Sequence, residues 1–97
     1  MQIQFQTGGK ALPNHVADFD IVFEEGVLNG LKLVGGALWS SKDGRPDLRV
    51  TLPAHKIVAE GKERYFDLLR AIDKNAQTIR DFKAAVVTAY RAHLRSA

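Results

Sequence analysis

The sequence predicts an α+β domain, in which a small antiparallel sheet of four to five strands is followed by a C-terminal α-helix. In the first three quarters of the chain, apolar and polar side chains alternate in short runs that turn residues separate. In the last quarter, apolar side chains recur every three or four positions, as on one face of a helix. The length of 97 residues suits a single domain, so residues 1–97 are assigned to one unit.

Two runs near the N-terminus show the alternation of strands with one buried face. Ile3 and Phe5 alternate with glutamines and predict a first strand that ends at residues 7–9. In the next run, Asp18 and Asp20 point to one side of a second strand. The residues between and beside them share the other, buried side: Ala17, Phe19, Ile21 and Phe23.

Turn residues and a proline divide the remaining strands. Asn29-Gly30 predicts a two-residue hairpin, because both positions tolerate positive φ, and Gly26 predicts a bulge before it. The apolar run 31–39 predicts a central strand, where Gly35-Gly36 would allow a close approach to the backbone. After a turn-rich tip at 41–46, alternation resumes and ends at Pro53. Residues 64–70 predict a last strand, with a helix as the alternative.

The C-terminal segment predicts a helix with two different flanks. Asn75 and Thr78 are both candidate N-caps. One flank is apolar and is suited to packing on a sheet or on a partner helix: Ile79, Phe82, Val86, Tyr90 and His93. Four basic residues occupy a separate arc of roughly 120°, which we call the basic flank: Arg80, Lys83, Arg91 and Arg95.

The net charge of +3 is located on this helix. Of the 14 basic and 11 acidic residues, four basic residues and Asp81 lie between positions 80 and 95, which leaves ten of each sign elsewhere. A localised basic stripe is the usual mark of a polyanionic partner, so we expect nucleic acid to bind there. A solvated helix face is the alternative interpretation.

A second group of basic residues surrounds the predicted hairpin tip and the last two strands. Alternation with Val50 directs Arg49 outward, where it would share a face with Thr51. The members expected to add phosphate contacts are Arg49, Lys56, Lys62 and Arg64, together with Lys42 and Arg45 at the tip. Trp39 either stacks on a base or, as we expect, packs in the core, and Tyr65 and Phe66 are expected to be buried.

Signatures of catalysis and of metal binding are weak. The chain has no cysteine, which excludes disulfides and sulfur-ligated zinc. His15, His55 and His93 lack the spacing of metal ligands, and we expect His93 to be a packing or interface residue. We therefore expect no catalytic residue, metal, cofactor or small-molecule substrate. Because no signal peptide is recognisable and no apolar run reaches about 18 residues, we expect a cytoplasmic protein without a membrane partner.

Four segments together resemble the stage V sporulation protein G (SpoVG) septation-regulator family. They are residues 21–34, Leu52-Pro53-Ala54-His55-Lys56, residues 61–72 and the helix with Phe82, Val86 and Tyr90. They cover about 70 residues, in the family's order and spacing. Ala54, His55 and Ala71 depart from the family's usual serine, basic residue and proline. The resemblance implies an antiparallel sheet with a C-terminal helix, a homodimer, and a regulator that binds DNA or RNA with His55 and Lys56 among its contacts.

The leading interpretation is a dimeric, non-catalytic regulator that binds DNA or RNA through the basic helix and the adjacent strand surface. The alternative is a protein-interaction or assembly module that binds no nucleic acid. In that case the apolar helix flank and an open sheet edge recruit another chain, and the basic flank only faces solvent. A small enzyme or a ligand-binding sheet is a third possibility, which a deep pocket lined by the paired carboxylates would support.

Overall fold

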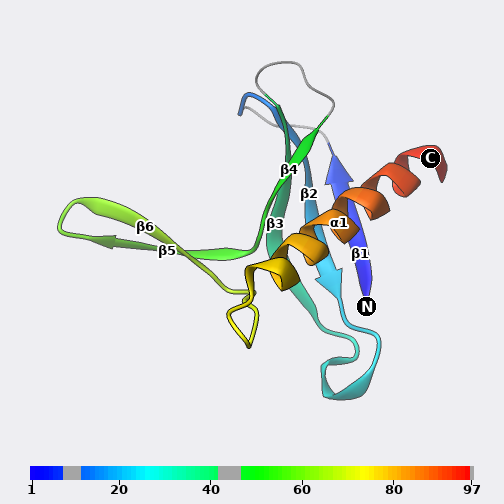
Figure 1. The fold of residues 1–97 in the computed structure, drawn as a ribbon, viewed down its shortest axis with the longest axis horizontal. Coiled ribbons are helices and arrows are strands. Elements are labelled where there is room, and N and C mark those ends of the chain that lie inside the picture. Colours follow the sequence, from blue (N-terminus) through cyan, green and yellow to red (C-terminus); the bar gives the residue numbers. More distant parts are fainter. Residues whose placement is uncertain (8–11, 42–46, 97) are drawn as a thin grey trace.

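Two antiparallel sheets and one helix make up the part of the chain that the computed structural model describes, residues 1–7, 12–41 and 47–96. The larger sheet has the order β1 (Gln2–Thr7), β2 (His15–Val22), β3 (Lys32–Ser40) and β4 (Leu48–Thr51). The second sheet pairs β5 (Ala54–Ala59) with β6 (Lys62–Asp67), and α1 (Ala76–Ser96) ends the chain. Figure 1 shows α1 crossing one face of the larger sheet, while β5 and β6 project away from it. The predicted α+β class is confirmed.

The alternation in β2 determines which face of the larger sheet is buried. Phe19 and Ile21 are almost fully buried, and they belong to one apolar cluster with Val86 and Tyr90 of α1. The antiparallel register pairs Phe5 of β1 with Phe19, which extends the apolar surface across the sheet. The predicted alternation of the first two strands is therefore confirmed, with the apolar residues facing α1.

The predicted apolar flank of α1 packs on this face. Asn75 is the N-cap, because its Oδ1 accepts a hydrogen bond of 2.9 Å from the backbone N–H of Gln77. The Phe5 ring meets the Tyr90 ring edge-on at a centroid distance of 5.2 Å, and it lies 5.4 Å from the His93 ring. Full burial of Val86 alone contributes about 1.5–3 kcal/mol relative to exposure.

β3 is the central strand, as predicted, and pairs with both β2 and β4. Its Gly36 lies against the ring of Phe19. A Cβ atom added at Gly36 would stand 2.3 Å from Cζ of Phe19, closer than two non-bonded carbon atoms can approach. Glycine at this position therefore makes room for the largest fully buried side chain beside the backbone of the neighbouring strand.

The connection between β2 and β3 differs from the predicted two-residue hairpin. A single 3₁₀ turn, Gly26–Leu28, lies within it. Asn29 has a φ of −53° and Gly30 a φ of 89°, and the Leu31 N–H donates to the Leu28 carbonyl at 2.9 Å. These angles define a type II turn, which needs positive φ at one central residue only. The Asn-Gly pair thus forms one turn of a longer loop, and the register shifts lie within β2 instead of at Gly26.

β5 and β6 form a hairpin that stands apart from the larger sheet (Figure 1). Pro53 separates β5 from the end of β4. The strand predicted for residues 64–70 is confirmed as far as Asp67. The two strands are joined at Glu60-Gly61, whose φ angles of 54° and 76° are typical of a type I′ turn. Residues 54–67 are called the arm below. The predicted tip at 42–46 and Gly8-Gly9 lie outside the described residues.

Gly36→Ala should lower the free energy of unfolding by about 1–3 kcal/mol, because the new methyl group forces the Phe19 ring to move within a packed core. Urea denaturation measures this cost. In a Phe19→Leu background the same substitution should cost clearly less, since the smaller side chain leaves room. An equal cost of Gly36→Ala in both backgrounds would contradict the contact.

Candidate nucleic-acid interface

The four cations of the basic flank point away from the sheet or along its edge. Arg80, Arg91 and Arg95 are exposed and Lys83 is half-buried. Within residues 1–7, 12–41 and 47–96, none of the four forms an ion pair. Their charges are therefore not compensated by acidic neighbours in that part of the fold, as a phosphate-binding surface requires.

Asp81, the one acidic residue of α1, does not neutralise the basic flank. Its Oδ1 accepts a hydrogen bond of 2.6 Å from Nε2 of Gln77. The Oε1 atom of Gln77 accepts in turn from Nε and Nη2 of Arg80, at 3.2 and 2.9 Å. This arrangement orients the Arg80 guanidinium along the first turns of the helix and leaves Nη1 for an external acceptor.

The structure brings Arg49 next to the basic flank. A shallow groove of about 280 Å³ lies between β4 and α1, and both Arg49 and Lys83 line it. Val50 and Val87 contribute the apolar part of the same groove. β4 is an edge strand of its sheet, and Arg49 pairs with Trp39 across the ladder, so the Arg49 side chain leaves β4 on the face of the sheet opposite α1. Arg49 therefore lies at the sheet edge near the basic flank but starts from the other face of the sheet.

The register of the arm divides its cations between two faces. Residues that pair across the ladder point to the same side: His55 with Phe66, Ile57 with Arg64, and Ala59 with Lys62. We call this side, which carries His55, Lys62 and Arg64 beside Ile57 and Phe66, the cationic face of the arm. Lys56 lies on the opposite side with Tyr65, and its Nζ is 2.9 Å from Oε1 of Glu63.

The predicted strand cations thus form no single surface with the helix. The arm projects away from the larger sheet, while α1 begins near the base of the arm and runs across the sheet in the other direction (Figure 1). Arg49 lines the groove beside α1 at the edge of the larger sheet, whereas His55, Lys62 and Arg64 lie on the cationic face of the arm. Lys56 faces the other way and is already paired with Glu63.

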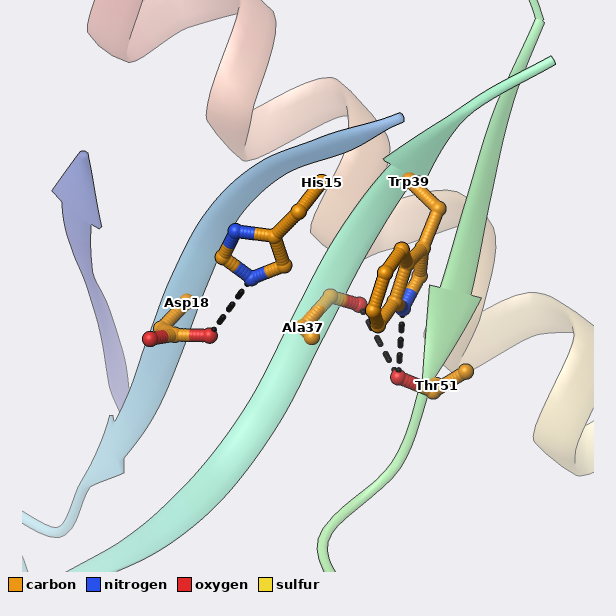
Figure 2. A network of polar contacts seen from close by, with 5 residues as sticks. All are labelled: His15, Asp18, Ala37, Trp39 and Thr51. Carbon is orange, nitrogen blue, oxygen red and sulfur yellow. Dashed lines mark hydrogen bonds and ion pairs between the residues drawn. The ribbon is translucent and has the colours of Figure 1, made fainter. Parts of the chain in front are cut away.

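The face of the larger sheet opposite α1, called the outer face, carries a polar network (Figure 2). His15 Nε2 lies 2.8 Å from Oδ1 of Asp18, and the His15 ring stands edge-on to Trp39 at a centroid distance of 4.9 Å. Trp39 Nε1 donates to Thr51 Oγ1 at 2.9 Å, and this hydroxyl donates to the carbonyl of Ala37 at 3.5 Å. These contacts hold the Trp39 ring in one orientation on the outer face.

Asp20 links three strands on the same face. Its Oδ2 accepts hydrogen bonds of 3.1 Å from Gln6 Nε2 of β1 and 3.1 Å from Lys32 Nζ of β3. Charge-assisted bonds to a nearly buried carboxylate are stronger than neutral ones. Asp20 therefore takes part in interstrand contacts, whereas the contact of Asp18 with His15 lies within β2.

Three aromatic residues are more exposed than predicted. Trp39 is half-buried on the outer face and is absent from the apolar core, so the expectation of core packing is wrong. Tyr65 and Phe66, expected to be buried, are 65% and 42% exposed. The reason is that both lie on the arm, all of whose strand residues are exposed. Alternation with the buried Leu38 is the signal that would have placed Trp39 on the outer face.

A groove of about 540 Å³ lies where the outer face meets the base of the arm. Trp39 and Ala37 line it from the sheet, Tyr65 and Asp67 line it from the arm, and Leu12 lies beside them. This groove, called the arm groove below, was not predicted, because it combines residues from distant parts of the chain. It is mostly apolar, and Asp67 is its one charged lining residue.

No protein-family model, curated protein or solved structure matches the chain. The resemblance to the SpoVG family therefore stays a prediction that rests on the four segments named above. No helix in the described ranges combines the length and the apolar character needed to cross a bilayer.

Arg91→Gln should leave the free energy of unfolding within about 0.5 kcal/mol of the wild-type value, because Arg91 is exposed and has no ion-pair partner in the described structure. Lys32→Gln removes the same charge from a contact with Asp20 and should cost about 1–2 kcal/mol. Thermal and urea denaturation measure both values. A larger loss for Arg91→Gln than for Lys32→Gln would show that Arg91 serves the fold.

Proposed function

We propose that this chain is a cytoplasmic, non-catalytic regulator that acts as a dimer and binds DNA or RNA through the basic flank of α1 together with Arg49. The observation that carries the proposal is the state of the helix cations. They occupy one flank of α1 and form no ion pair within the described residues, while the apolar flank of the same helix packs on the sheet.

The energetics of such a surface favour a polyanion. Cations that the fold does not neutralise attract phosphates, and binding releases the counterions condensed on the nucleic acid. Three of the four residues of the basic flank are arginines, whose guanidinium groups bind phosphate oxygens in a bidentate geometry. Arg80 and Arg95 are separated by roughly 22 Å at a rise of 1.5 Å per residue. That length corresponds to about six base-pair steps of a duplex.

The proposal includes no base-specific contact. Phosphate contacts position a protein without reading sequence, whereas base readout needs side chains in a groove or aromatic stacking. The basic flank carries long, flexible cations beside alanines and contains no aromatic side chain. We therefore expect affinity to depend far more on salt than on nucleotide sequence.

A protein-interaction or assembly module is the second candidate, and the arm favours it. Five large apolar side chains, Ile57, Val58, Tyr65, Phe66 and Leu68, are exposed on or next to the arm. They lie on both faces of the arm, with Ile57 and Phe66 on one side and Val58 and Tyr65 on the other, and exposed apolar surface of this kind marks sites of protein interaction. A stable dimer that fails to bind oligonucleotides at low salt would support this candidate over the first.

If five cations contact phosphates, the logarithm of the affinity should fall with the logarithm of salt concentration at a slope of about −4.5 for duplex DNA and −3.5 for single strands. Fluorescence anisotropy with labelled single- and double-stranded DNA and RNA measures both slopes. Neutralising Arg80, Lys83, Arg91 and Arg95 with glutamine should flatten the duplex slope by about 3.6.

A matched pair of single variants controls for net charge. Arg91→Gln should weaken binding to every sequence alike, whereas Lys74→Gln removes the same charge from the exposed turn before α1 and should leave affinity unchanged. Unaltered binding in the quadruple variant, or equal losses for Arg91→Gln and Lys74→Gln, would contradict contact through the basic flank.

A further inference from the structure

As an isolated hairpin, the arm would have little conformational stability. A two-stranded hairpin is at best marginally stable in water without a further layer. Every residue of β5 and β6 is exposed, and Glu60 adopts a φ of 54°, which is costly for a residue other than glycine. The ladder of six residue pairs must therefore gain stability from something that covers it.

The cationic face of the arm combines apolar and basic side chains. Ile57 and Phe66 are each 42% exposed there, and Lys62 and Arg64 are its charged members. No acidic residue of the described strands shares this face, because Glu63 and Asp67 point to the other side of the ladder. A complementary surface would offer an apolar floor and a carboxylate.

The arm groove has both properties. Its floor is formed by Leu12, Ala37 and Trp39, and its one charged lining residue is Asp67. Trp39 is held in place by its bond to Thr51 (Figure 2), so the floor is preorganised. The cationic face of an arm cannot reach the groove at its own base, because the opposite face of the same arm lines that groove.

We propose that two copies of this chain exchange arms: the cationic face of each arm lies in the arm groove of the other copy. Ile57 and Phe66 then pack beside Trp39 of the second copy, and Lys62 or Arg64 approaches its Asp67. The exchange is reciprocal, so a two-fold axis closes the assembly at a dimer and leaves no open end.

Two side chains of the cationic face carry the apolar contact. Ile57 and Phe66 are each 42% exposed, and together they present on the order of 200 Å² of surface per arm. Because the exchange is reciprocal, this contact occurs twice in the dimer.

Arm exchange supplies the interface for the dimer of the proposed function, and it rests on the proposed function only for the existence of that dimer. In the exchanged dimer, Lys62 and Arg64 are interface residues, so the basic flank and Arg49 remain as the polyanion surface of each copy. The arms can be tested without nucleic acid, and the basic flank can be tested in a dimer whose arms are intact. Failure of one proposal is therefore distinguishable from failure of the other.

Sedimentation velocity without nucleic acid should show a wild-type dimer at micromolar concentration. Ile57→Glu should shift the protein to monomer, because it places a carboxylate on the apolar floor of the partner's groove. The hairpin itself should persist, since the new carboxylate faces Arg64 across the ladder. Val27→Glu introduces the same charge at an exposed β-branched residue far from the arm and should leave the dimer intact.

A second variant tests the arm groove, which receives the arm of the other copy. Leu12→Glu in the arm groove should also give monomer, although it leaves the arm unchanged. An equimolar mixture of the Ile57→Glu and Leu12→Glu proteins should regain dimer, because the heterodimer contains one intact arm seated in one intact groove. Circular dichroism shows that each variant keeps the wild-type sheet and helix content.

Three results would overturn the proposal. They are a wild-type protein that stays monomeric across the concentration range, an Ile57→Glu variant that dimerises like the wild type, and a mixture of folded variants that shows no rescue. A Leu12→Glu variant that dimerises like the wild type would also overturn it, because such a result indicates a dimer in which the two arms contact only each other.

Discussion

Everything in this fold depends on the packing of one helix across one face of a four-stranded sheet. Phe19 packs against Gly36 and belongs to one buried cluster with Val86 and Tyr90 of α1. A single helix can cover only one face of a sheet and presents only one of its own flanks to it. The opposite flank of α1 therefore faces outward, and in this chain that flank carries the excess positive charge.

The same constraint explains the surfaces that the fold leaves available for partners. A domain of 97 residues buries a limited share of its chain surface, and its buried apolar core comprises few side chains. The outer face of the sheet instead gains cohesion from polar contacts such as the two bonds to Asp20. The arm gains little from the body of the same chain, which makes association a source of stability as well as of function.

Local patterns in the sequence predicted the elements that a local physical rule determines. The alternation around Phe19 and the helical spacing of Val86 and Tyr90 each reflect one buried face, so periodicity identified β2 and α1. The basic flank was predictable for the same reason. A two-residue hairpin was predicted at Asn29-Gly30, but the structure has a type II turn within a longer loop. The prediction was wrong because this dipeptide suits both type I′ and type II turns.

Periodicity and turn patterns within single segments could not predict contacts between segments that are far apart in the sequence. Arg49 and Lys83 line one groove because β4 lies at the sheet edge beside α1, which alternation within either segment does not reveal. The exposure of Tyr65 follows from the separation of the arm from the larger sheet, which depends on where the chain turns at Pro53. The arm groove likewise exists only once Trp39 and Tyr65 are brought together by the fold.

Nucleic acid is expected on the basic flank and a second copy of the chain on the arm, and amide chemical shifts distinguish these two surfaces. Titrating a short oligonucleotide into isotopically labelled protein, followed by ¹H–¹⁵N correlation spectra, locates the bound surface residue by residue. We expect shifts concentrated along residues 80–95 of α1 and in β4, with the amides of residues 54–67 little changed. Shifts confined to residues 54–67, or an absence of shifts at low salt, would contradict it.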